Sequence, residues 1–130
     1  MNSVRRIALI ALVALASISA QAEWIFLIEQ DGVKHFVDSS VKKTDDGMRR
    51  IWVLLNMDMG AALASFSYSS RSLQEWDCRQ ERYRILTAKT YSGLMASGSI
   101  IREMEAASDW SYIPPESIGV RYLKFACAGK

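Results

Sequence analysis

The sequence has few of the residues on which enzyme and metal sites depend. Its 130 residues include one histidine, two cysteines and two prolines. The histidine, His35, lies in an alternating stretch typical of a β-strand, where it is more often packed or solvent-facing than catalytic. A zinc site would lack ligands if both cysteines are oxidised. No Gly-x-Ser-x-Gly motif is present, so a hydrolase with a nucleophile elbow is not indicated. We therefore expect neither an enzyme nor a bound metal ion.

Two weaker patterns also fall short of a site. Gly93 and Gly98 have the spacing of a phosphate-binding loop, but Ser99 stands where a lysine must hold the phosphates. Met57 and Met59 hint at a copper site with thioether ligands, yet no histidine or third methionine lies nearby in the sequence. The sequence therefore predicts no cofactor.

The N-terminus has the pattern of a signal peptide for export. Arg5 and Arg6 precede an unbroken apolar run over residues 7–16, and Ala20 and Ala22 then provide the spacing of a cleavage site. A membrane-spanning helix needs about 20 apolar residues, and this run is about half as long. We expect a Sec signal peptide over residues 1–22, cleaved after Ala22. We expect no membrane span and, because no cysteine follows the apolar run, no lipid anchor.

The balance of charge argues against nucleic-acid and membrane partners. Loss of Arg5 and Arg6 would lower the count of basic residues from 16 to 14, which equals the count of acidic residues. A neutral domain lacks the field that recruits nucleic acid or an anionic membrane. Neighbouring carboxylates such as Glu103 and Glu105 are expected to be solvated, because a glycosidase needs a pair across a cleft. Residues 23–130 are enough for a single domain.

The two cysteines, Cys78 and Cys127, bear on compartment and architecture. Export would place them in an oxidising space, where two cysteines favour one internal bridge. That bridge would close a loop of about 50 residues and contribute about 4 kcal/mol to the free energy of unfolding. The alternatives are two buried thiols or a bridge between two chains. The absence of a C-x-x-C pair argues against a redox function.

The hydrophobic pattern predicts a sheet built from hairpins. An Asp-Gly turn at Asp31 and Gly32 joins the first two expected strands. A later strand has apolar residues on both faces and is expected to be central or covered. The last two expected strands turn at residues 79–81. The strands are expected over residues 24–30, 33–37, 48–58, 68–78 and 82–93.

Other segments allow two interpretations. A helical turn over residues 38–41 is an option within the connector after the first hairpin. Residues 59–67 are rich in small side chains and fit a loop or a short helix. Residues 99–107 fit a strand or a short helix. A helix over residues 70–86 competes with the second hairpin.

The C-terminal segment is predicted to be helical. Pro115 suits the first helical position, and Glu116 suits the first turn, where a carboxylate faces the positive end of the helix dipole. An apolar stripe at helical spacing follows, formed by Ile118, Tyr122 and Phe125. Cys127 would end this helix, so a bridge to Cys78 would fasten the helix to the end of a strand, where fraying would otherwise begin.

Basic residues gather around the second hairpin. Within 14 residues, four arginines are interleaved with two aromatic residues: Arg71, Arg79, Arg82 and Arg84 with Trp76 and Tyr83. On a hairpin, Arg82 and Arg84 would share one face, and Arg71 could lie across from them. Such a cluster could bind a sulfated glycan, a phosphate or an acidic protein surface. The alternative is a solvated face whose arginines are neutralised by Glu75, Asp77 and Glu81.

A series of short motifs, taken in order, resembles one known family. The motifs are an Asp/Ser connector, a Trp-Val strand, a serine pair before an Asp-Cys, an Arg/Tyr-rich strand, a Tyr-Ser-Gly loop, a tryptophan before a Pro-x-Ser segment, and a final helix ending in cysteine. In this chain they are Asp38 and Ser40, Trp52 and Val53, Ser69 and Ser70, Asp77 and Cys78, Arg82 to Arg84, Tyr91 to Gly93, Trp110, Pro115 with Ser117, and Cys127. Together they resemble the surface-adhesin protein E-like family of exported Gram-negative proteins, over nearly all of residues 23–130.

The resemblance implies an α+β domain, with an antiparallel β-sheet of about five or six strands and a C-terminal α-helix packed on it and tied by one disulfide. It also implies a non-enzymatic protein that attaches to host matrix or other proteins, in the periplasm or outside the cell of a Gram-negative bacterium. The chain departs from the family's namesake, a surface lipoprotein, because it lacks a lipid-accepting cysteine.

The alternative function is that of a periplasmic inhibitor or accessory protein, which binds an acidic or glycan partner through the arginine-rich hairpin. An exposed edge strand could also pair two copies into a homodimer.

Overall fold

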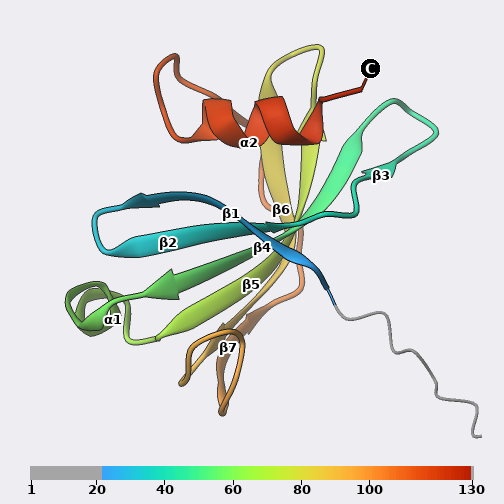
Figure 1. Cartoon of the computed structure of the whole chain (residues 1–130). Coiled ribbons are helices and arrows are strands. Elements are labelled where there is room, and N and C mark those ends of the chain that lie inside the picture. The colour runs from blue at the N-terminus through green and yellow to red at the C-terminus, as the bar shows by residue number, and fades with distance from the viewer. Residues whose placement is uncertain (1–21, 130) are drawn as a thin grey trace, which may run out of the picture.

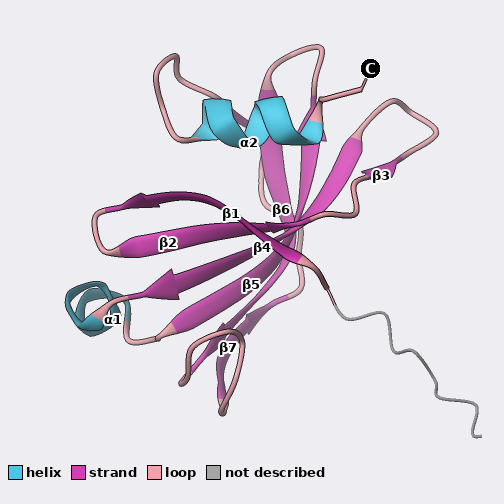
Figure 2. Ribbon diagram, viewed as in Figure 1, coloured by secondary structure: helices cyan, strands magenta, loops and turns pink. Residues whose placement is uncertain are grey.

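The structure is a computed structural model that describes residues 22–129. The predicted signal peptide, apart from Ala22, lies outside the described residues. Figures 1 and 2 show the arrangement of strands and helices. In chain order the elements are β1 (Trp24–Gln30), β2 (Val33–Asp38), β3 (Lys42–Lys43), β4 (Arg49–Met57), α1 (Met59–Ser65), β5 (Ser69–Asp77), β6 (Arg82–Tyr91), β7 (Ile100–Met104), β8 (Ser111–Tyr112) and α2 (Gly119–Ala126).

One curled antiparallel sheet contains all the strands of the described region. Its main path runs β1–β2–β4–β5–β6–β7, while β3 pairs with β4 and β8 pairs with β6. Figure 1 shows α2 lying across one end of the sheet, with α1 and β7 well away from it. The expected α+β fold, an antiparallel sheet of six main strands with a C-terminal helix, is therefore confirmed.

The first hairpin has the turn that its sequence predicts. Asp31 and Gly32 both adopt positive φ, at 52° and 77°, as a two-residue turn with the twist of the flanking strands requires. Gly32 is also in close contact with Asp58, the residue between β4 and α1. A Cβ atom at Gly32 would lie 2.5 Å from the carboxylate oxygens of Asp58, whose backbone N–H donates to the Gly32 carbonyl at 2.8 Å. A side chain at Gly32 would therefore strain the backbone and displace the Asp58 carboxylate.

The second hairpin is formed by β5 and β6, which excludes the competing helix over residues 70–86. Asp77 shapes its turn: Oδ1 accepts from the backbone N–H of Arg79 at 3.1 Å and of Gln80 at 3.2 Å. This side-chain capping of a turn is typical of aspartate. The chain then reverses through Glu81, which has a φ of 52°.

The ambiguous segments are resolved by their neighbours. The option of a helical turn over residues 38–41 is wrong, because β2 continues to Asp38 and β3 begins at Lys42, where it can pair with β4. The segment after β4 forms helix α1, whose N-cap Asp58 accepts from the Ala61 N–H at 2.9 Å. Of the two interpretations of residues 99–107, the strand is the one found, as β7.

The expected start of the C-terminal helix at Pro115 is wrong. Helix α2 begins at Gly119, and Glu116 has a φ of 63°, so it lies in a turn and not in a helix. The chain before the turn is held at the edge of β6, where the Ile113 N–H donates to the Glu81 carbonyl at 3.0 Å. A residue that precedes proline disfavours helical backbone angles, and Pro114 precedes Pro115. The chain must therefore turn before it can cross the sheet as a helix.

The main core lies between α2 and one face of the sheet, here called the helix-covered face. Its buried side chains are Val37, Ile51, Val53, Trp76, Tyr122 and Ala126. The Cys78–Cys127 disulfide closes this side of the molecule, with a Cα–Cα distance of 5.9 Å. It joins the end of β5 to the end of α2, so the predicted bridge between strand and helix is confirmed.

Candidate functional site

Two hairpin arginines, Arg82 and Arg84, lie on the opposite face of the sheet, here called the outer face, and are bound to buried carboxylates. Residues directly opposite one another in an antiparallel pair share a face. Glu75 lies opposite both Arg50 on β4 and Arg84 on β6. Its Oε2 accepts from Arg50 Nε at 2.8 Å, and its Oε1 accepts from Arg84 Nη2 at 2.7 Å and Nε at 3.1 Å. One buried carboxylate therefore holds two arginines.

A second pair lies beside the first. Asp77 is opposite Arg82, and its Oδ2 accepts from Arg82 Nε at 3.0 Å. Burial raises the pKa of Asp77, but hydrogen bonds from the Gln80 N–H, from Arg82 and from the Arg79 N–H outweigh it and hold this pKa below its usual value. Asp77 is therefore ionised at neutral pH and keeps Arg82 in place.

Trp110 covers the two β6 arginines. The guanidinium carbons of Arg82 and Arg84 lie 4.4 and 4.5 Å from the centroid of its ring, within the range of a cation–π contact. The tryptophan is positioned by β8, which pairs Tyr112 with Arg82 and Ser111 with Tyr83. Trp110, the next residue back along the chain, is thereby brought to Arg84. We call Arg50, Arg82, Arg84 and Trp110 the arginine–tryptophan face.

The other residues of the predicted arginine cluster lie elsewhere. Arg71 lies further along the outer face, 4.3 Å from the ring centroid of Trp52, and its buried Nε makes no hydrogen bond within residues 22–129. Arg79 is exposed in the β5–β6 turn. Trp76 and Tyr83 lie on the helix-covered face, where Trp76 is 1% exposed. The structure thus brings Arg82 and Arg84 together and separates them from the rest.

Two members of the arginine–tryptophan face were missed in the sequence. Trp110 stands 26 residues after Arg84 and was noted only for its family pattern. Arg50 lies 25 residues before Glu75, on a strand that touches the hairpin only through the sheet register. The available signal was the alternation on the strand 49–57, which places Arg50 with Trp52 on one face, but it does not say which hairpin residue lies opposite.

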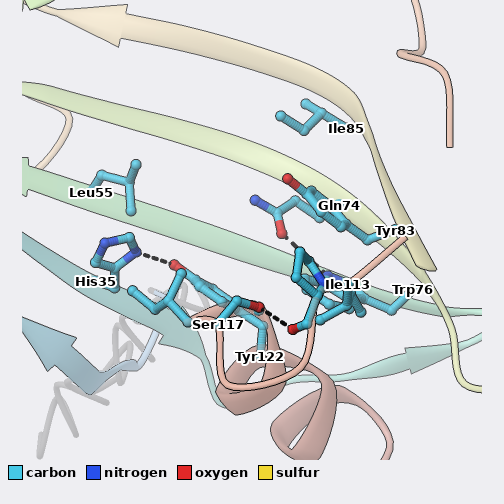
Figure 3. Close-up of a pocket in the computed structure, with 12 residues that line it drawn as sticks. His35, Leu55, Gln74, Trp76, Tyr83, Ile85, Ile113, Ser117 and Tyr122 are labelled. Carbon is cyan, nitrogen blue, oxygen red and sulfur yellow. Dashed lines mark hydrogen bonds between the residues drawn. The ribbon is translucent and has the colours of Figure 1, made fainter. Parts of the chain in front are cut away.

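A cleft on the helix-covered face is the second candidate site. It has a volume of about 370 Å³ and lies between the sheet and the segment that leads into α2. Figure 3 shows it framed by Leu55, Ile85 and Gln74 on one side and by Ile113, Ser117 and Tyr122 on the other. No carboxylate, lysine or arginine of residues 22–129 lines the cleft.

The cleft contains one hydrogen-bonded titratable pair. His35 Nδ1 lies 2.5 Å from the hydroxyl oxygen of Tyr122. Burial lowers the pKa of His35 below its usual value. Burial also raises the pKa of Tyr122, with electrostatic repulsion between the two phenolates, Tyr122 and Tyr83, as a smaller cause. Both side chains are therefore neutral at pH 7. Gln74, the other buried polar residue here, is bonded to Ser72 and Trp76.

Neither site has the parts of a catalytic centre. Within residues 22–129, the side-chain hydrogen bond of His35 goes to the Tyr122 phenol, whose pKa is raised, and not to a serine, threonine or cysteine. General-base catalysis needs a base within reach of the proton to be removed. Within residues 22–129, no three histidine, cysteine or acidic side chains come together as a metal site would require. None of the helices described for residues 22–129 has both the length and the apolar character needed to cross a membrane.

The fold is similar to that of solved structures from one bacterial species. Two crystal structures of Haemophilus influenzae protein E match with TM-scores of 0.63 and 0.60, each at 13% identity, over 83% of this chain and 89% and 86% of theirs. Protein E from non-typeable Haemophilus influenzae matches with a TM-score of 0.58 at 11% identity, over 82% of this chain and 76% of that one. At such identities the likeness concerns the fold alone.

The family is shown by comparison of the sequence with family models. No curated protein matches it. The family model described as "Surface-adhesin protein E" matches residues 24–128, from the first residue of β1 to just beyond the disulfide. The resemblance seen in the order of short motifs is thereby confirmed. This chain belongs to the surface-adhesin protein E family.

Proposed function

We propose that this chain is an exported, non-enzymatic binding protein that attaches to host matrix proteins or to other proteins. The observation that carries the proposal is the family match over residues 24–128, because membership in a family of surface adhesins implies export and a binding role in Gram-negative bacteria. The absence of a base–nucleophile pair in the described residues agrees with a role in binding. The identity of the partner rests on the family alone.

The processing of the chain is part of the proposal. We infer cleavage after Ala22, which would release residues 23–130 as a single domain. Strand β1 begins at Trp24, so the domain would start directly after the cleavage site. The disulfide needs an oxidising compartment, which is consistent with the periplasm or the exterior of the cell.

Solid-phase binding tests the adhesive role. The purified, oxidised protein is titrated onto immobilised matrix proteins and onto albumin as a control surface. We expect saturable binding to at least one matrix protein that survives 150 mM salt. Protein whose disulfide has been reduced provides the matched control. Binding to albumin alone, or equal binding to all surfaces, would contradict an adhesive function.

A second candidate function is recognition of an acidic or glycan partner through the arginine–tryptophan face. The observation in its favour is that Arg82 and Arg84 both lie against Trp110, with Arg50 on the carboxylate that it shares with Arg84. The planar guanidinium groups of arginines are suited to sulfate and carboxylate. Glu75 and Asp77 offset much of this charge: three arginines against two carboxylates leave one net positive charge. We therefore rank this function below attachment to protein.

Heparin chromatography at rising salt separates the two functions. If the arginine–tryptophan face binds glycan, Arg82→Ala with Arg84→Ala lowers the eluting salt concentration. Arg79→Ala with Arg121→Ala, at two exposed arginines outside this face, is the control of equal charge change. Because exposed ion pairs are screened by salt, a glycan interaction is expected to fail near physiological ionic strength. Matrix binding that persists in the double variant favours the first function.

A homodimer is the remaining partner proposal. Strands β1 and β7 end the main path of the sheet, and each has a free hydrogen-bonding edge within the described region. All residues of β7 are exposed, including Ile100 and Ile101. Sedimentation of the purified protein at several concentrations tests for pairing, with Ile101→Lys on the β7 edge as the variant expected to remain monomeric.

A further inference from the structure

We propose that the cleft between the sheet and the segment 113–119 binds an uncharged aromatic small molecule of two or three rings. The cleft lies on the helix-covered face, away from the arginine–tryptophan face. The inference does not depend on the proposed adhesive function. It follows from the size of the cleft, the chemistry of its lining and the way its walls are held.

The size of the cleft fits a ligand of this kind. Its volume is about 370 Å³, which lies within the range of about 300–1,000 Å³ found for small-molecule sites. An apolar cavity of about 150 Å³ accepts benzene, so by proportion this cleft holds about 15 non-hydrogen atoms. That is the size of a substituted naphthalene and is too small for a folded segment of protein.

The lining selects for aromatic groups. Trp76 is stacked on Tyr83, with ring centroids 4.8 Å apart and planes 15° apart, and on Tyr122, at 5.6 Å and 13°. Trp76 and Tyr122 are almost fully buried, so the stack forms the floor of the cleft, and the partly exposed Tyr83 is the ring that a ligand can meet (Figure 3). Leu55 and Ile85 provide the apolar side chains of the cleft. A flat ring system can both pack against Tyr83 and cover the aliphatic groups.

The lining also selects against charge. Among the residues that the structure describes, no lysine, arginine or carboxylate lines the cleft, and its histidine is neutral at pH 7. An ionised ligand would lose its hydration there without gaining a partner of opposite charge, which is costly. His35 offers a polar contact to a ligand. Its Nδ1 is taken by Tyr122, whereas Nε2 makes no hydrogen bond within residues 22–129. Nε2 donates to a ligand oxygen or nitrogen when Nδ1 accepts from the Tyr122 hydroxyl, and accepts from a ligand N–H or O–H in the other tautomer.

The walls of the cleft are held in place before any ligand binds. The Ser117 hydroxyl donates to the Pro114 carbonyl at 2.7 Å, which closes the turn that forms one wall. Gly119 lets this wall pack tightly, since a Cβ there would lie 3.0 Å from a methyl carbon of Ile113. The disulfide to Cys127 secures the far end of α2. A site that is already formed spends little of its binding free energy on ordering.

A pair of fluorescent probes with one skeleton tests the proposal. The neutral N-phenyl-1-naphthylamine is titrated into the purified, oxidised protein, alongside 1-anilinonaphthalene-8-sulfonate, which carries a sulfonate on nearly the same rings. We expect saturable binding of the neutral probe at one site per chain, with quenching of tryptophan emission. The sulfonated probe is expected to bind at least about 10-fold more weakly. Absence of saturable binding, or equal affinity for both probes, overturns the proposal.

A matched pair of variants assigns the site. Ile85→Phe adds volume inside the cleft and is expected to weaken the neutral probe at least about 10-fold, whereas Ile100→Phe makes the same change on exposed β7 and is expected to leave affinity unchanged. Equal affinity in both variants places the probe elsewhere and overturns the assignment. Circular dichroism checks that each variant is folded.

A measurement on the unaltered protein covers the case in which Ile85→Phe does not fold. In NMR spectra of the complex, the naphthyl protons are expected to show nuclear Overhauser contacts to the methyl groups of Leu55 and Ile113. Contacts to Leu63 or Ile101, which line a separate apolar hollow between α1 and β7, would show binding at that surface instead and would contradict the proposal.

Discussion

Glu75 lies directly opposite Arg84 in the β5–β6 ladder, is 2% exposed, and accepts two hydrogen bonds from the arginine's guanidinium group. A buried carboxylate is stable only when it is paired, and here Arg50 supplies a second cation from the neighbouring strand. The arginine–tryptophan face is therefore built on ion pairs that share buried carboxylates, and its three arginines are engaged before any partner arrives.

Replacement of Glu75 by glutamine should destabilise the protein. The change leaves Arg50 and Arg84 without their shared anion, and loss of one partner from a buried pair costs about 3–5 kcal/mol. Because both arginines are partly exposed, water screens the loss, and we expect about 1–3 kcal/mol. Urea denaturation measures the difference. The control is Glu103→Gln, whose exposed partner Lys89 is 3.7 Å away and should contribute less than about 0.5 kcal/mol. Equal effects would show that burial of Glu75 is not decisive.

The disulfide should account for a large part of the stability. Cys78 and Cys127 are 49 residues apart, and replacing both by alanine should lower the free energy of unfolding by about 4 kcal/mol, because the unfolded chain regains the entropy of that loop. Guanidinium denaturation of the wild-type and double-variant proteins measures the change. Mass spectrometry of the exported protein should find both thiols oxidised. Two free thiols would contradict the architecture.

His35 should make stability depend on pH in the mildly acidic range. Its folded-state pKa lies below the ordinary 6.5 because the ring is buried. On acidification the unfolded chain therefore takes up a proton before the folded protein does. The free energy of unfolding falls as the pH drops below 6.5, by at most about 1.4 kcal/mol per unit, and levels off below the folded-state pKa.

Denaturation curves between pH 8 and pH 5 measure this slope, and His35→Gln should remove it. Asp77 acts in a separate window, because its folded-state pKa lies below 3.8. Its contribution is complete above pH 3.8 and is lost as the pH falls through the folded-state pKa. A slope above pH 5 that persists in His35→Gln would assign it to another group.

Trp110 should stabilise the arginine–tryptophan face. Replacement by alanine removes its contacts with Arg82 and Arg84, which at this partial exposure are together worth about 1–2 kcal/mol. The neighbouring Tyr112 is 67% exposed, and Tyr112→Ala is the control that should change stability little. Thermal denaturation of both variants measures the difference. If the two changes are equally mild, the stacking of Trp110 has no role in stability.

The local features of the fold were predicted well because each depends on a few adjacent residues. Asp31 and Gly32 specify a tight turn through backbone angles that favour glycine and aspartate, whatever surrounds them. The apolar residues on both faces of β4 indicated a covered strand, and Ile51 and Leu54, on opposite faces, are both fully buried. The start of α2 was misplaced because Pro115 suits a helix start by itself, whereas the pairing of the preceding chain with β6 forces a turn there.

By itself the sequence determined most of the strand pattern, the tight turns and the family, because periodicity, turn chemistry and motif order are written along the chain. It favoured an internal bridge between its two cysteines, which the structure contains. Only the tertiary structure decided which side chains meet. Trp110 reaches Arg82 and Arg84 through the pairing of β8 with β6, and His35 reaches Tyr122 across 87 residues. Such contacts depend on sheet register and on the path of the chain over the sheet, where a shift of one residue would turn every side chain to the other face.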